Sequence, residues 1–151
     1  MGEMRLEELS AKTIVAANSL SLRPGQEQFV TPTSYAMAEP ELNPVTQWQR
    51  VVLDASDVVV GFILANFDPD AAREEFRCAL WRINVAAQAQ GLGVGTFAAH
   101  GLAEEARSRG FTRLTTIWER GEDGPEQFFL RIGFTVIGET QYGENIGALE
   151  L

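Results

Sequence analysis

Leu80-Trp81-Arg82-Ile83-Asn84-Val85, followed by Gln90-Gly91-Leu92-Gly93-Val94-Gly95, is the stretch that decides the fold. Its first half is an apolar run typical of a buried strand, and residues from about Thr96 to Arg109 have the periodicity of a helix. Glycines at alternate positions let the backbone approach a ligand without interference from Cβ atoms. The helix start directs N–H groups and the positive end of its dipole at the same point. The pattern therefore predicts a site for a phosphate-bearing ligand.

Two familiar nucleotide-binding motifs fit this turn poorly. A P-loop needs a Lys-Ser or Lys-Thr pair after its last glycine, whereas Val94-Gly95-Thr96 follows Gly93. A Rossmann fingerprint needs glycine or alanine where Thr96 stands, and its acidic residue would come earlier in the chain than Glu119. Both alternatives are disfavoured.

The elements around this stretch predict an α/β (α+β) protein with a mixed sheet, because strands cluster with interposed helices. Turn-prone Asp54-Ala55-Ser56-Asp57 lies between two β-branched runs and indicates a hairpin. Residues 66–75 are polar and predict a surface loop, and Tyr142-Gly143-Glu144-Asn145 separates two closing strands. We expect strands at 4–9, 51–53, 58–64, 77–85, 114–118, 135–138 and 148–151, and helices at 12–20, 35–39, 96–109 and 125–132.

Length and composition predict a single domain over residues 1–151, since the chain is 151 residues long and 45% hydrophobic. There is no apolar run long enough for a membrane span, and Met1 to Arg5 lacks the regions of a secretory signal. The one cysteine, Cys78, cannot form an internal disulfide and lies in an apolar run that predicts a buried, inert thiol. A cytoplasmic protein is the simplest interpretation.

The net charge of −9 argues against nucleic-acid binding and favours a cationic partner, although solubility alone also explains an acidic chain. Glu39 and Glu41, near the end of a predicted helix, could bind a cationic substrate; the alternative is that both are solvated. His100, the only histidine, has no Cys or Asp partner at ligand spacing, so we predict an exposed or hydrogen-bonded helical histidine and no metal site.

Gln90-x-x-Gly93-x-Gly95 resembles the acetyl-coenzyme A motif of the GCN5-related N-acetyltransferases (GNAT). The resemblance implies a mostly antiparallel central sheet with flanking helices and a splayed strand pair, and acetyl-coenzyme A as co-substrate. It also implies that Ile83 and Val85 pair with the pantetheine arm, and that the Val85 N–H faces the thioester oxygen as an oxyanion contact. The alternative is an ordinary glycine turn before a core helix. The implied cofactor contacts are Ile83, Asn84, Val85, Gln90, Gly91, Leu92, Gly93, Val94, Gly95, Thr96 and Phe128.

A second segment, Gly124-Pro125-Glu126-Gln127-Phe128-Phe129-Leu130-Arg131-Ile132-Gly133-Phe134, is similar to the C-terminal motif of the same family. More narrowly, residues 22–32, the triplet Leu80-Trp81-Arg82 and Gly124-Pro125 resemble the bacterial spermine/spermidine (diamine) branch. That likeness implies a polyamine acceptor, and family analogy implies a homodimer.

One departure concerns the chemistry. The family's general acid, a tyrosine that protonates the departing thiol, would occupy position 129, where this chain has Phe129. Water, Tyr35 or Tyr142 would have to replace it, or the thiol would leave as thiolate. Glu119, at the end of a strand beside the splay, is the predicted base, with a solvated loop carboxylate as the alternative. The sequence thus predicts N-acetylation of a small amine; the rivals are an antibiotic or peptide acceptor, or a weakly catalytic cofactor-binding protein.

Overall fold

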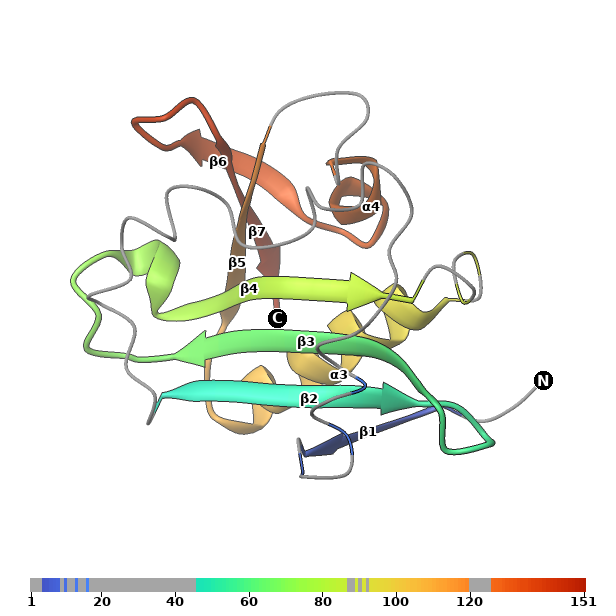
Figure 1. Cartoon of the computed structure of the whole chain (residues 1–151). Coiled ribbons are helices and arrows are strands. Elements are labelled where there is room, and N and C mark those ends of the chain that lie inside the picture. Colours follow the sequence, from blue (N-terminus) through green and yellow to red (C-terminus); the bar gives the residue numbers. More distant parts are fainter. Residues whose placement is uncertain are drawn as a thin grey trace.

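The computed structural model describes residues 4–8, 10, 13, 16, 46–86, 89, 91, 93–119 and 126–151. The helices predicted at 12–20 and 35–39 lie outside these residues, apart from isolated positions. Seven strands form one sheet in the order β1-β2-β3-β4-β5-β7-β6 (Figure 1). The strands are β1 (Arg5–Glu8), β2 (Gln47–Leu53), β3 (Val59–Phe67), β4 (Cys78–Val85), β5 (Arg113–Trp118), β6 (Thr135–Glu139) and β7 (Asn145–Glu150). The described helices are α3 (Val94–Ser108), α4 (Glu126–Arg131) and a short 3₁₀ turn, η3 (Glu74–Phe76).

The predicted mixed, mostly antiparallel sheet is confirmed. Only β4 and β5 pair in parallel, and every other neighbouring pair is antiparallel. The predicted hairpin is the β2–β3 pair, whose strands extend further than the β-branched runs alone indicated. Within the described ranges, no helix has the length and hydrophobicity needed to cross a bilayer.

Two loop predictions were wrong at their edges. Asn66, expected in a surface loop, lies in β3 with 1% of its surface exposed, because its amide binds both Thr46 Oγ1 (2.6 Å) and the Phe76 carbonyl (2.7 Å). Asn145, expected in the last turn, begins β7, and it and Glu144 are buried. In both places pairing within the sheet buries polar residues whose type favours a turn.

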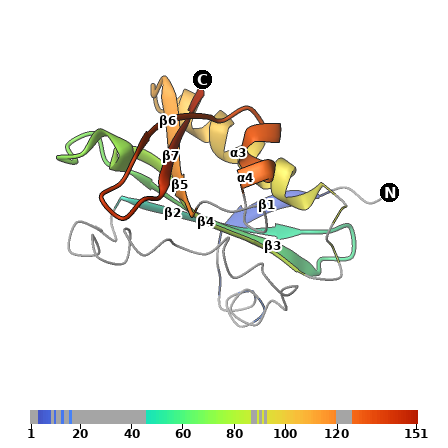
Figure 2. The same ribbon diagram turned by 90° about the horizontal axis from the view of Figure 1, so that it is seen from above.

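Helices α3 and α4 lie on the same side of the sheet (Figure 2). The main core fills the space beneath them and includes Leu80, Ile83 and Val85 from β4, and Ala98 and Leu102 from α3. Two smaller apolar clusters lie on the opposite face. One contains Phe76, Ala79, Trp81 and Ile117, and the other contains Val51, Leu53 and Val59.

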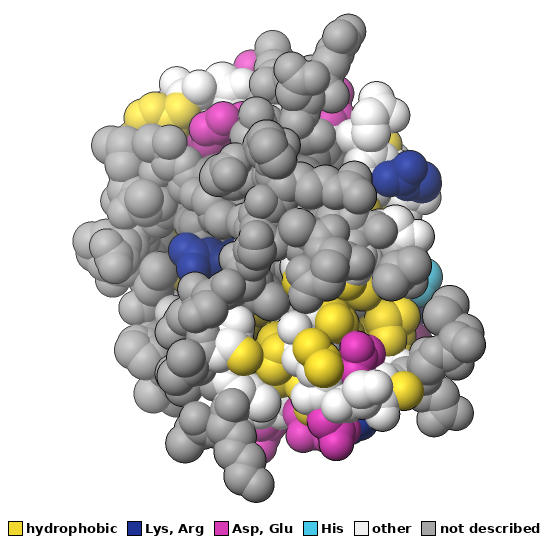
Figure 3. Space-filling view, turned by 45° about the vertical axis from the view of Figure 1, so that its right-hand side comes forward, with side chains coloured by type: hydrophobic (Ala, Val, Ile, Leu, Met, Phe, Trp, Pro, Cys, Tyr) yellow, Lys and Arg dark blue, Asp and Glu magenta, His cyan; other side chains and the backbone are white. Residues whose placement is uncertain are grey.

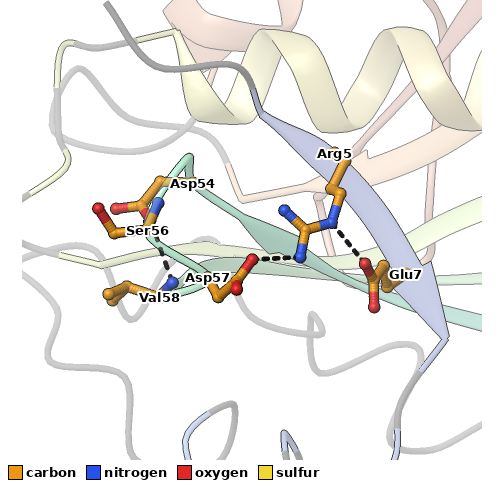
Figure 4. Close-up of polar contacts among 6 residues, drawn as sticks. All are labelled: Arg5, Glu7, Asp54, Ser56, Asp57 and Val58. Atoms are coloured by element: carbon orange, nitrogen blue, oxygen red, sulfur yellow. Dashed lines mark hydrogen bonds and ion pairs between the residues drawn. The ribbon is translucent and has the colours of Figure 1, made fainter.

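Strand β1 pairs with β2 at the sheet edge, and a polar contact joins it to the turn of the β2–β3 hairpin (Figure 4). Arg5 pairs with Glu7 at 2.5 Å and with Asp57 across the strands. The hairpin turn is closed by Asp54, whose carboxylate accepts hydrogen bonds from the Ser56 and Val58 amides at 2.8 and 3.0 Å. Such exposed ion pairs contribute little stability, so the antiparallel ladder itself is the main attachment of β1.

A β-bulge in β4 separates this strand from its parallel neighbour. Leu80 lies opposite Ala65 while Arg82 lies opposite Leu64, so Trp81 is an extra residue on β4. The pairing of β4 with β5 also ends here, with Leu80 opposite Thr116. A bulge bends its strand and increases the local twist, and beyond this point the two strands diverge (Figure 1). The predicted splayed strand pair is therefore present.

Candidate active site

The glycine turn leaves its backbone accessible to a ligand. Gly91 and Gly93 have φ of 81° and 83°, and a Cβ added to either would meet nothing within 4 Å. Helix α3 begins at Val94, two residues before the predicted start, with Gly93 as its N-cap. The cap has no side-chain hydrogen bond and the first turn has no acidic residue. An anion is therefore the group that this helix start is best suited to bind.

A cavity of about 410 Å³ opens beside this turn. Eight of the predicted contact residues line it, namely Ile83, Val85, Gly91, Gly93, Val94, Gly95, Thr96 and Phe128. Ala89 and Arg131 also line it and were not predicted. The Phe128 ring crosses from α4 to α3 at Gly95, where an added Cβ would lie 3.1 Å from the ring. The absence of a Cβ at Gly95 thus allows this close approach of the ring, and the φ of Gly95 is not positive.

The backbone of β4 has two sides with different neighbours. The Ala86 N–H donates to the Val60 carbonyl at 2.9 Å, so alternate residues from Ala86 backwards direct their backbone groups at β3. Ile83 and Val85 are the residues in between. They direct their backbone groups at the side from which β5 has diverged, as the predicted pantetheine pairing requires.

Phe129 is buried beneath Phe128 rather than exposed in the cavity. Its side chain is 4% exposed and stacks on Trp118, the last residue of β5, with ring centroids 5.2 Å apart. Trp118 Nε1 and Asn145 Nδ2 both donate to Glu126 Oε1, at 3.1 and 2.8 Å. Glu126 thereby ties α4 to the ends of β5 and β7. Position 129 lies within this packed junction, next to the splay.

The sheet face opposite α3 carries polar side chains beside the splay. Arg82 and Asn84 alternate with Ile83, which faces the core, so both project from this opposite face. Arg82 Nε and Asn84 Oδ1 are buried atoms without a hydrogen bond in the described structure. Glu119 follows the end of β5 and is exposed. Glu144, which the sequence did not single out, is buried beside it on the neighbouring strand.

The remaining predictions concern single residues. Gln90, Leu92, Glu39 and Glu41 lie outside the described residues. His100 is exposed on α3. Cys78 is buried as predicted, and burial raises the pKa of its thiol to about 12. Among the described residues, no three His, Cys, Asp or Glu side chains are placed to hold a metal ion.

Some hydrophobic side chains of the described residues are exposed at the end of the molecule at which β4 finishes. With the right-hand side of Figure 1 turned forward, hydrophobic side chains gather into one patch with acidic side chains along its lower border (Figure 3).

Solved structures with this arrangement are acetyltransferases of low sequence identity. Nourseothricin acetyltransferase is 18% identical, with 97% of this chain and 98% of that chain aligned and a TM-score of 0.69. The PaiA N-acetyltransferase from Thermoplasma acidophilum, solved with coenzyme A, is 11% identical with 99% of each chain aligned and a TM-score of 0.71. An aminoglycoside 6'-N-acetyltransferase, also solved with coenzyme A, is 18% identical, with 97% and 96% aligned and a TM-score of 0.66. At these identities the likeness shows the fold.

Membership of a family comes from the sequence itself. No curated protein is significantly similar in sequence to this chain. The model of the acetyltransferase (GNAT) family, however, matches residues 18–134. This match covers well over half of the chain and includes the glycine turn, the splayed strands and the aromatic pair on α4. The chain therefore belongs to the acetyltransferase (GNAT) family, and acetyl-coenzyme A is its co-substrate.

Proposed function

We propose that this N-acetyltransferase acetylates a primary amine of a small molecule, and that polyamines such as spermidine and spermine are the first acceptors to test. The divergence of β4 from β5 beside the glycine turn carries the proposal, because the cavity lies on one sheet face at this point and polar side chains lie on the other. The net charge of −9 and the narrower sequence resemblance support a cationic acceptor.

The residues of the cavity fit acetyl-coenzyme A. The open backbone at Gly91 and Gly93 and the uncapped start of α3 suit a pyrophosphate. Apolar side chains of Val85 and Phe128 suit the pantetheine arm, and Arg131 adds a cation to the cavity lining. The co-substrate supplies the activated acetyl group. We assign two further predicted contacts, Gln90 and Leu92, to the same binding site, whereas the Asn84 side chain projects from the opposite sheet face and its backbone pairs with β3, so Asn84 is not assigned to it.

The acceptor amine needs a base and the reaction needs a stabilised oxyanion. An alkylammonium has a pKa of about 10.4, so removal of its proton at neutral pH costs roughly 4.6 kcal/mol. We assign this proton transfer to Glu119, the exposed residue that directly follows β5. We assign the oxyanion contact to the Val85 N–H, and the register of β4 with β3, which directs this group away from β3, supports the assignment.

Two other functions keep the same fold. The acceptor could be an amine-bearing antibiotic or a peptide amine, and the fold is shared with acetyltransferases named for nourseothricin and aminoglycosides. A weakly catalytic protein that binds acyl-coenzyme A is the other candidate, and Phe129 is the observation that favours it. A single domain over 1–151, a homodimer and a cytoplasmic location stay predictions.

The deciding experiment measures thiol release from acetyl-coenzyme A with spermidine, spermine, an aminoglycoside and a peptide amine. We expect release above background with a polyamine. Release with only the aminoglycoside or the peptide would replace the polyamine acceptor. No release with any amine, together with thermal stabilisation by coenzyme A, would support the cofactor-binding protein.

A further inference from the structure

Glu144 is a buried carboxylate for which the described residues supply no cation. The residue is 4% exposed and directly precedes the first residue of β7. The Thr140 hydroxyl donates to Glu144 Oε1 at 3.2 Å, while Oε2 is buried without a hydrogen bond. Within the described ranges no arginine or lysine forms an ion pair with it. Buried carboxylates are normally paired, because an uncompensated charge in a protein interior is costly.

The alternation of side chains along β7 places Glu144 on the sheet face opposite α3. Gly147 faces the main core, since a Cβ added there would lie 2.3 Å from the Trp118 ring. Leu149, two residues further, packs against the same core. Ile146 instead packs against the opposite apolar cluster, together with Trp81 and Ile117. Glu144 is two residues before Ile146 and therefore projects from the same face.

The strand register brings Glu144 beside Glu119. The last residue pair of β5 and β7 is Trp118 and Asn145. The residues directly beyond this pair are Glu119, after β5, and Glu144, before β7. Glu119 is two residues after Ile117 and shares its face. Two carboxylates thus lie at the end of β5, one exposed and one buried, beside the apolar side chains of Ile117 and Ile146.

We propose that Glu144 binds a second ammonium group of the acceptor, separate from the amine that is acetylated. The inference rests on the proposed function and makes the acceptor a diamine or polyamine. An ammonium group has three hydrogen-bond donors. Glu144 Oε2 is a hydrogen-bond acceptor that receives no hydrogen bond in the structure. The neighbouring apolar side chains would contact the methylene chain between the two nitrogens. A monoamine would leave Glu144 without its partner.

The test is Glu144→Gln, which removes the charge but keeps an amide oxygen to accept from Thr140. Steady-state kinetics with putrescine and with butylamine compare a diamine with a monoamine of the same carbon count. We expect the KM for putrescine to rise about tenfold or more, the loss typical of one charge-assisted hydrogen bond. The KM for butylamine and that for acetyl-coenzyme A should stay unchanged. Glu150→Gln, an exposed residue on the same face of β7, is the matched control and should change neither.

Other results would overturn the proposal. An equal rise in KM for both amines would place the reacting amine at Glu144, and a lower melting temperature with unchanged KM values would show a structural role. Arg82 projects from the same sheet face and is the rival cation. If it pairs with Glu144 in solution, Arg82→Gln and Glu144→Gln will destabilise non-additively and the diamine-specific effect will be missing.

The inference can also be separated from the proposed function. Calorimetric titration of spermidine into the wild-type protein and Glu144→Gln measures acceptor binding without turnover. Tenfold weaker binding to the variant, in a protein that releases no thiol with any amine, would support the ammonium site and refute the acetyltransfer proposal. Equal binding to both proteins would refute the ammonium site.

Discussion

Arg131 provides the sharpest test of how the cavity holds its co-substrate. It is an exposed residue at the end of α4, and it lines the cavity that the glycine turn opens. No ion pair or hydrogen bond joins it to another described residue, unlike Arg107, Arg109 and Arg113. A phosphate group in the cavity would give its guanidinium a partner. We therefore expect Arg131→Gln to weaken binding of coenzyme A.

The size of the effect follows from the exposure of Arg131. Exposed ion pairs contribute about 0–1 kcal/mol, whereas hydrogen bonds to charged groups contribute about 1.5–3 kcal/mol. A guanidinium at the mouth of a cavity lies between these cases, so we expect a loss of about 1–2 kcal/mol. This corresponds to a dissociation constant roughly five- to thirtyfold higher. Because the Debye length falls from about 10 Å at 0.1 M salt to about 3 Å at 1 M, the difference should shrink with added salt.

The assay is isothermal titration of coenzyme A into the wild-type protein, Arg131→Gln and Arg107→Gln at low and high salt. Arg107 is exposed at the far end of α3 and pairs with Glu104, so its variant controls for net charge. Dephospho-coenzyme A identifies the phosphate: a loss confined to coenzyme A indicates the 3′-phosphate, and an equal loss for both ligands indicates the pyrophosphate. Equal dissociation constants for the wild type and Arg131→Gln at low salt would refute the reasoning, as would a loss that salt does not change.

Three further outcomes are expected. Phe129→Tyr restores a hydroxyl at the position of the family's acid and should raise the rate of thiol release, by up to about 10²–10⁴-fold; an unchanged rate in stopped-flow would show that this position does not limit the chemistry. Gly147→Ala should lower the urea unfolding midpoint by the equivalent of about 1–3 kcal/mol, since its methyl would overlap the Trp118 ring that Phe129 and Glu126 hold in place. Gly138→Ala, with its nearest neighbour 4.0 Å away, is the control, and equal midpoints would contradict this packing. Burial raises the pKa of the Cys78 thiol to about 12 from a reference of 9.0. At pH 8 the alkylation of Cys78 should therefore be roughly a thousandfold slower in the folded protein than in urea. The contribution of the protonated thiol to the free energy of unfolding should fall only as the pH rises from about 9 towards 12. Rapid alkylation of the folded protein would show that the thiol is accessible.

Local patterns in the sequence predicted the part of the site that a short segment builds alone. The glycine turn, the strand before it and the helix after it are consecutive, and seven of their predicted contact residues line one cavity. Arg131 was missed because an arginine in the last turn of a helix is already explained by the helix dipole. Its position in the cavity depends on how α4 packs against α3.

Glu144 was missed for a different reason. Tyr142-Gly143-Glu144-Asn145 has the composition of an exposed turn, and sequence alone gives no sign that a glutamate there is buried. Its position beside the end of β5 follows from the antiparallel pairing of β7 with β5, a contact between residues far apart in the chain. Asn66 is a similar case, since its two hydrogen-bonding partners come from other segments.

The extra residue at Trp81 shifts the alternation of side chains along β4, so that the residues before and after it follow different phases. Leu80 and Ile83 face the same core although they are three positions apart, so the alternation of the first half is out of phase with that of the second. Without Trp81 the strand would alternate in a single phase and Arg82 and Asn84 would keep their face, whereas regular pairing with Trp81 retained would turn them towards α3. The bulge therefore lets both halves of β4 contribute apolar side chains to the same core, while the polar side chains of the second half stay on the opposite face.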